Sequence, residues 1–174
     1  MVVAVQERGY FSKRLDICKD LPDIFELVKD AVRQCTGWQR AGLMLGLADL
    51  GGGPQGFIGA YYPVASNIIV MNKLPLRNIE QTEHSLYKPY AFHILLHEYL
   101  HSLGLLDEST TRAKVHEISS ALFGEDHIVT KIASDLSSFV PKLIYPDQEW
   151  SPPEDTGLQL IKGFDRSSTD PYIY

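Results

Sequence analysis

The sequence predicts an α+β fold in which a small, mostly antiparallel or mixed sheet is followed by a helical C-terminal half. Three observations lead to this prediction. An apolar stripe with helical spacing occupies residues 21–34. Short runs typical of strands, bounded by Gly, Pro and Asn, fill residues 41–71. Long segments with apolar residues at three- and four-residue steps then occupy residues 90–140.

The elements are predicted in chain order as follows. The first helix, Leu21–Gln34, has Pro22 in its first turn and Gly37 beyond its end. Strands are expected at residues 41–47, 56–62 and 67–71, with a Gly/Pro loop at residues 51–54. Helices are expected at about residues 90–103, 109–123 and 126–140, which end near Gly104, Gly124 and Pro141.

The last thirty residues differ from the rest in composition. From Tyr145 the chain reads YPDQEWSPPEDTG, which is rich in proline and acid. We therefore predict one domain over residues 1–144 and an extended tail over residues 145–174. Four apolar residues give this tail a means of docking back onto the domain: Leu158, Leu160, Ile161 and Phe164.

Composition and charge narrow the classes of function. The chain has 174 residues, 44% of them hydrophobic, which is enough to bury a core unaided. Its formal net charge of −6 disfavours a nucleic-acid partner. No apolar run approaches the ~18 residues that cross a bilayer, and no signal peptide is evident at the N-terminus. We therefore expect a cytoplasmic protein with no membrane partner and with reduced cysteines.

The pattern that carries chemistry is HEYLH at residues 97–101. On a helix His97 and His101 project from one face, so both imidazoles can bind one zinc ion at ~2.0–2.1 Å. Glu98 lies to one side of this pair, where it can take the proton of a zinc-bound water without binding the metal. The sequence therefore predicts a catalytic Zn²⁺ site with Glu98 as general base.

Two acids compete for the third metal position. Gly104 lets the chain turn back after the helix, which favours Asp107 as the ligand, although an aspartate there can instead cap the next helix. Glu117 is the rival, because a following antiparallel helix can bring it to the same ion. The other histidines of this region are expected in the core or outer sphere of the site, on the surface, or at helix caps: His93, His116 and His127.

The segment HEYLHSLGLLD resembles the zincin superfamily of metallopeptidases, and within it the snapalysin-type metzincins, in which aspartate is the third ligand. This resemblance implies a zincin-like fold, with residues 1–144 as the catalytic domain. It also implies that His97, His101 and Asp107 bind zinc. No methionine follows Met71 to form the turn that metzincins place beneath the metal. The segment HEISSALFG is similar to the glutamate helix of the gluzincins, with Glu117 in the ligand place.

The expected activity is hydrolysis of peptide bonds by a zinc metallopeptidase acting on a peptide or protein substrate. In zincins the strand before the active-site helix pairs with substrate, and NIIVMN is placed to be such an exposed edge strand. Tyr61, Tyr62 and Tyr90 are candidates for stabilising the oxyanion. The alternatives are a zinc endoribonuclease-like hydrolase, because of the H-x3-H-x5-acid spacing, and a non-catalytic zinc-binding protein. Autoinhibition by the tail or the N-terminal segment is a further expectation.

Overall fold

The computed structural model describes residues 5–52, 56–146 and 150–166, and its mixture of helices and strands agrees with the predicted α+β class. The helices are α1 (Val5–Ile17), α2 (Leu21–Thr36), α3 (Lys73–Thr82), the 3₁₀ helix η1 (His84–Leu86), α4 (Tyr87–Ser102), α5 (Glu108–Phe123), α6 (Ile128–Ser134) and α7 (Leu136–Phe139). The strands are β1 (Met44–Ala48), β2 (Phe57–Ile58), β3 (Ala60–Tyr61), β4 (Ile68–Asn72), β5 (Leu143–Ile144) and β6 (Gln159–Leu160). Residues 53–54 of the predicted loop and 147–149 and 167–174 of the predicted tail lie outside the described residues.

Helix α2 closely matches the first predicted helix. The Asp20 side chain accepts a hydrogen bond from the backbone N–H of Asp23 at 2.9 Å, which caps the first turn. Gly37, with a φ of +78°, ends the helix in the left-handed conformation that glycine adopts without strain. The apolar stripe read from the sequence is buried in the core: Ile24, Leu27, Val28, Ala31 and Val32.

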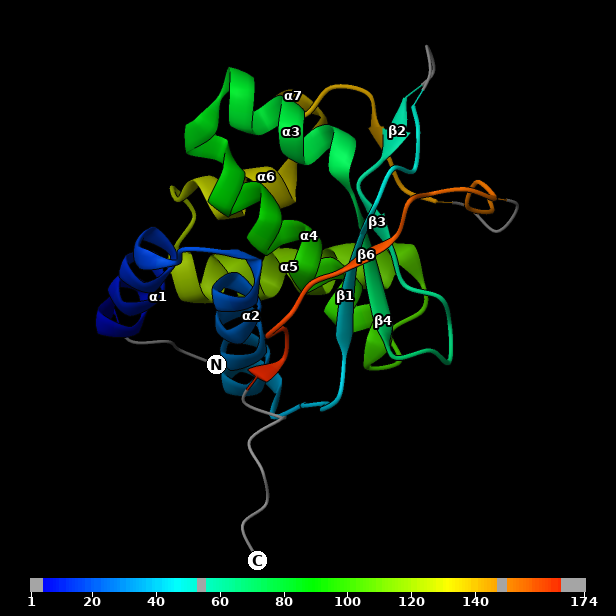
Figure 1. The fold of residues 1–174 in the computed structure, drawn as a ribbon. Coiled ribbons are helices and arrows are strands. Elements are labelled where there is room, and N and C mark those ends of the chain that lie inside the picture. The colour runs from blue at the N-terminus through cyan, green and yellow to red at the C-terminus, as the bar shows by residue number, and fades with distance from the viewer. Residues whose placement is uncertain (1–4, 53–55, 147–149, 167–174) are drawn as a thin grey trace, which may run out of the picture.

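The main sheet is mixed and has the strand order β3-β4-β1-β6 (Figure 1). Strands β1 and β4 are parallel, with Met44 opposite Ile68, whereas β3 and β6 are antiparallel to their neighbours. The prediction that NIIVMN forms an exposed edge strand is therefore wrong, because β4 lies between β3 and β1. The short strand before the turn at residues 62–66 pairs with β4 and becomes the edge strand itself.

Helix α4 lies at the centre of the helical layer and packs against α2, α5 and α6 (Figure 1). Every residue from Pro89 to Ser102 is buried, so this helix has no solvated face. A helix that is apolar on nearly all sides is stable only when neighbours cover it. The few polar side chains on α4 are therefore held inside the core.

Several elements were not predicted, or differ from the prediction. In helix α1, among residues 9–17, whose burial is described, Phe11 and Leu15 are the buried apolar side chains, and two such residues are too sparse a pattern to read from sequence. Helix α3 begins where the Asn72 side chain accepts the N–H of Leu74 at 3.2 Å, and Pro75 occupies its first turn. The predicted helix at 126–140 is split into α6 and α7 because Asp135, with φ −155° and ψ 77°, leaves the helical conformation.

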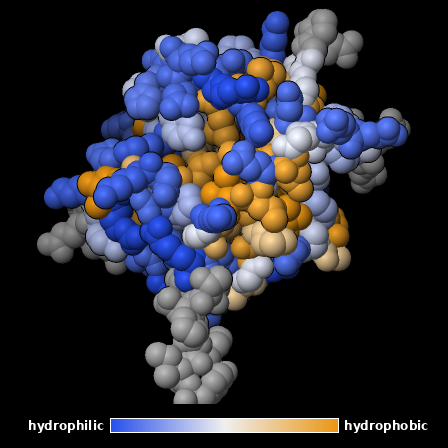
Figure 2. Space-filling model, viewed as in Figure 1, coloured by the Kyte–Doolittle hydropathy of each residue, from blue (hydrophilic) through white to orange (hydrophobic). Residues whose placement is uncertain are grey.

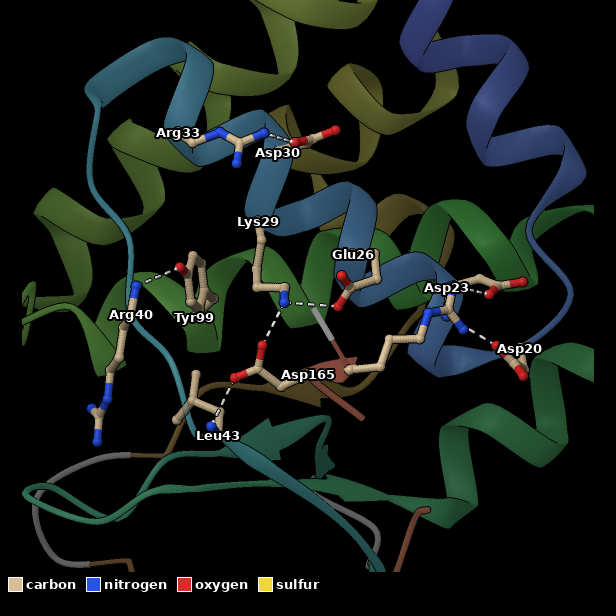
Figure 3. A network of polar contacts seen from close by, with 11 residues as sticks. Asp20, Asp23, Glu26, Lys29, Asp30, Arg33, Arg40, Leu43, Tyr99 and Asp165 are labelled. Carbon is tan, nitrogen blue, oxygen red and sulfur yellow. Dashed lines mark hydrogen bonds and ion pairs between the residues drawn. The ribbon is translucent and has the colours of Figure 1, made fainter. Parts of the chain in front are cut away.

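The segment after residue 149 docks onto the domain. Strand β6 pairs with β1, and the ring of Phe164 stacks on that of Phe25 with centroids 4.0 Å apart. Asp165 is fully buried, accepts the backbone N–H of Leu43 at 2.9 Å and pairs with Lys29 (Figure 3). The docking foreseen for Phe164 is thus observed.

The outer face of the main sheet is apolar, and Figure 2 shows hydrophobic residues clustered over its strands. Leu158 packs over Gly46 of β1, and yet it and Leu160 remain half exposed. Among the described helices, none combines the length and the apolar character that a bilayer crossing requires.

Candidate metal centre

The HEYLH motif lies in the last turns of α4, where every residue is buried. His97 is 1% exposed, Glu98 4% and His101 9%. The ligand atoms of these three residues lie within 4.8 Å of one another, so this buried group could hold a metal ion. The helix ends at Ser102, and Gly104, with a φ of +106°, turns the chain back toward the site as the sequence predicted.

The chain that turns back brings Glu108, the first residue of α5, onto the two imidazoles. Its Oε1 lies 2.8 Å from Nε2 of His101, and its Oε2 lies 3.0 Å from Nε2 of His97. The two Nε2 atoms are 3.1 Å apart. Two imidazole nitrogens and one carboxylate thus converge on a single point, although sequence reasoning did not single out Glu108.

Asp107, the predicted third ligand, does not point at the imidazoles. Its Oδ2 accepts hydrogen bonds from the backbone N–H and the hydroxyl of Thr110, at 2.8 and 2.7 Å, which makes Asp107 the N-cap of α5. These two bonds lower the pKa of the exposed carboxyl, because they favour its charged form. The capping alternative weighed from the sequence is therefore the arrangement observed, and Glu108, one residue later, occupies the place expected for Asp107.

Three further candidates from the sequence do not belong to the group of converging donors. Glu117 has a side chain that is 66% exposed and pairs with Lys114 at 2.7 Å. His127 caps α6, where its Nδ1 accepts the N–H of Val129. His93 is buried one turn before His97, and burial, with a smaller contribution from His97, lowers its pKa to about 3.

The hydrogen bonding of His101 bears directly on whether the site fits a cation. Its Nδ1 lies 2.6 Å from the carbonyl oxygen of Leu105, which can only accept, so Nδ1 carries the proton. In the neutral imidazole Nε2 then carries a lone pair, and this lone pair faces Oε1 of Glu108 at 2.8 Å. Such lone pairs repel one another unless a proton or a metal ion lies between them.

The distances agree with a small tetrahedral ion. Zinc bonds of ~2.0–2.1 Å place tetrahedral donor atoms roughly 3.3 Å apart. The two Nε2 atoms are 3.1 Å apart, and each lies 2.8 or 3.0 Å from a different oxygen of Glu108, which is a few tenths of an ångström shorter. A small outward movement of the side chains would therefore let this donor set hold a small metal ion.

The carboxyl of Glu98 is buried beside the two histidines. Burial raises the pKa of its carboxyl, with a smaller contribution from Glu108, while His97 and His101 act in the opposite direction. Its Oε2 has no hydrogen-bond partner within the described residues. In Glu108, burial also opposes ionisation, but the contacts with His101 and His97 outweigh it and lower the pKa to about 2.

A cleft of about 750 Å³ opens onto this group, and Glu98, His101 and Glu108 form part of its lining. The other walls come from the turn after β3, the α4–α5 connection and the C-terminal segment: Tyr61, Tyr62, Pro63, Val64, Leu106, Asp107, Pro146, Trp150 and Pro152. Of the three predicted oxyanion candidates, Tyr61 and Tyr62 thus line the cleft, whereas Tyr90 is fully buried in the core. A larger cavity of about 870 Å³, beside Cys18 and Tyr87, shares no lining residue with this cleft.

Comparison with protein-family models, curated proteins and solved structures finds no match to this chain. The zincin resemblance of HEYLH therefore stays a prediction from the motif.

Proposed function

We propose that this protein is a metal-dependent hydrolase that cleaves peptide bonds, with zinc held by His97, His101 and Glu108. The observation that carries the proposal is the convergence of two imidazole nitrogens and a carboxylate at 2.8–3.1 Å beside a cleft that His101 and Glu108 line. Two imidazoles and one carboxylate, with access for a further group, are the donor set of catalytic zinc sites.

The residues around the donors have distinct tasks in this proposal. The bound ion would supply Lewis acidity toward a water molecule and the scissile carbonyl. Glu98 lines the cleft, and its Oε2 has no hydrogen-bond partner among the described residues, so it can accept a proton from the attacking water and deliver it to the leaving nitrogen. Burial of His97 and Glu98 excludes bulk water from the back of the site.

The edge strand β3 favours a peptide as the substrate. Strand β3 is the first strand in the order of the main sheet, β3-β4-β1-β6. Tyr61, in this strand, and the next two residues line the cleft. An extended peptide can pair with an edge strand through its backbone, which would lay its amide bonds across the donor group. This geometry replaces the predicted pairing with β4, which is interior to the sheet.

Metal analysis of matched variants tests the donor assignment. We expect one equivalent of zinc in the wild-type protein and in Asp107→Asn, because asparagine keeps the helix cap. Glu108→Ala should weaken zinc binding by more than about 100-fold, the upper end of what loss of an outer-sphere partner costs. Equal zinc content in Asp107→Asn and Glu108→Ala would contradict the assignment.

Activity is tested on denatured casein, with structured RNA as the alternative substrate. We expect casein cleavage that a chelator abolishes and zinc restores. Glu98→Gln should retain zinc but lose roughly 10²- to 10⁴-fold in turnover, the usual contribution of a general base. Cleavage of RNA alone, or full turnover by Glu98→Gln, would refute the proposed reaction.

A further inference from the structure

The two histidines of the proposed site differ in what fixes their rings. The Nδ1 of His101 hydrogen-bonds the carbonyl of Leu105 at 2.6 Å, which sets both its tautomer and its ring plane. The Nδ1 of His97 is buried and has no hydrogen-bond partner among the described residues. The Nε2 of His97 contacts Glu108 and His101, and a contact on the face of the ring would further restrict rotation about its Cβ–Cγ bond.

That contact comes from the ring of Tyr145. It stacks on His97 with ring centroids 4.9 Å apart and an angle of 26° between the planes. No other ring within the described residues is recorded in parallel stacking with His97, since its contact with His101 is edge-on, at 83°. Stacking restricts the rotation that the missing hydrogen bond would leave free.

Tyr145 is itself held in place from two sides. It follows β5 directly, and β5 pairs with β2 in parallel register, with Leu143 opposite Phe57. From α5, the guanidinium of Arg112 lies 5.0 Å from the centroid of the tyrosine ring, within the range of a cation–π contact. The ring is thus supported by a strand pair and by the helix that carries Glu108.

We infer that Tyr145 is a positioning residue for His97, supplying by ring stacking what the Leu105 carbonyl supplies to His101 by a hydrogen bond. The inference rests on the proposed metal site. It assigns the role to the aromatic ring and not to the hydroxyl group. It also places a determinant of metal affinity more than forty residues beyond HEYLH, in a segment whose sequence resembles a tail.

Zinc affinity measured against a chromophoric chelator separates the ring from the hydroxyl. Tyr145→Phe keeps the stacked ring, so its zinc affinity should stay within about twofold of wild type. Tyr145→Ala should weaken zinc binding by roughly 10- to 100-fold, the cost typical of losing an outer-sphere partner of a ligand. Tyr145→Leu retains apolar volume without an aromatic face and should fall in the same range, should the alanine variant fail to fold.

Tyr61→Ala is the matched control, because Tyr61 is a cleft tyrosine whose recorded ring partner is Trp150 and not a histidine. Its zinc affinity should equal that of wild type. Wild-type affinity in Tyr145→Leu, or equal losses in Tyr145→Phe and Tyr145→Ala, would overturn the positioning role and leave the metal site standing. Absence of zinc from the wild-type protein would overturn both.

Discussion

Replacing Lys29 with methionine tests whether the buried ion pair with Asp165 fastens the C-terminal segment to the domain. The Lys29 side chain is 12% exposed and that of Asp165 is 0% exposed. The lysine also pairs with Glu26 at 2.7 Å (Figure 3). Methionine has a similar length but no charge, so the buried carboxylate of Asp165 would lose the ammonium group of Lys29.

The expected loss follows from this burial. Removing one partner of a buried ion pair costs about 3–5 kcal/mol, mainly because the other charge stays buried without compensation. For a chain of this length each kcal/mol lowers the midpoint of thermal unfolding by roughly 2–4 °C, so Lys29→Met should melt roughly 6–20 °C below wild type. Most of the loss should disappear in Lys29→Met/Asp165→Asn. Asparagine tolerates the positive φ of 52° at this position and can still accept the N–H of Leu43.

The assay is urea and thermal unfolding followed by circular dichroism, with Arg33→Met as the control. Arg33 lies on the same helix and pairs with Asp30, but its side chain is 59% exposed, so its loss should cost about 0–1 kcal/mol. Equal destabilisation by Lys29→Met and Arg33→Met would refute the reasoning. So would a double variant that is less stable than Lys29→Met alone.

Three further changes probe the cap, the strand pair and the pH response. Asp107→Ala should cost about 1 kcal/mol of unfolding free energy in a urea titration and Asp107→Asn almost nothing, and equal losses would argue against the cap. Gly56→Ala should destabilise the fold, because φ at this position is +133° and the carbonyl oxygen of Lys142 leaves no room for a Cβ. It should also weaken zinc binding, because Gly56 precedes β2, whose pairing with β5 supports Tyr145. An unchanged melting temperature would contradict this prediction. Asp23 has a pKa lowered by the N–H of Lys19 and by Arg166, so its contribution is present above about pH 4 and is lost as the pH falls through its folded-state pKa. Asp23→Asn should therefore melt below wild type at pH 7, and the gap should narrow as the pH falls below about 4; a gap that stays constant in acid would exclude this origin.

The sequence predicted those parts of the fold that depend on local spacing. Helix α2 has a cap, a first-turn proline and a terminal glycine, all within seventeen residues of one another. Helix α4 and its turn at Gly104 are equally local. The strands β5 and β6 have two residues each, and so short a run carries no periodic signal. Their pairing with β2 and β1 depends on partners about ninety to one hundred and ten residues away in the chain.

The same limit applies to the candidate site. His97, Glu98 and His101 lie on one helix, so their spacing alone places them together. Choosing between two adjacent acids, Asp107 and Glu108, depends on which one caps α5, and the common use of aspartate as a cap favours Glu108 for the metal. Tyr145 could not have been found in this way, because its place depends on the β2–β5 pairing.

The complete enclosure of α4 has a thermodynamic consequence. Two of the three proposed donors, His97 and His101, are part of the helix that the other helices pack around, and Glu108 begins α5, which packs against it, so the donor geometry cannot survive unfolding of the core. An ion that binds only the folded chain stabilises it by RT ln(1 + [M]/Kd), about 4 kcal/mol at a thousandfold excess over Kd. A series of melting curves with zinc, cobalt and manganese would therefore rank the ions by affinity, with no substrate required.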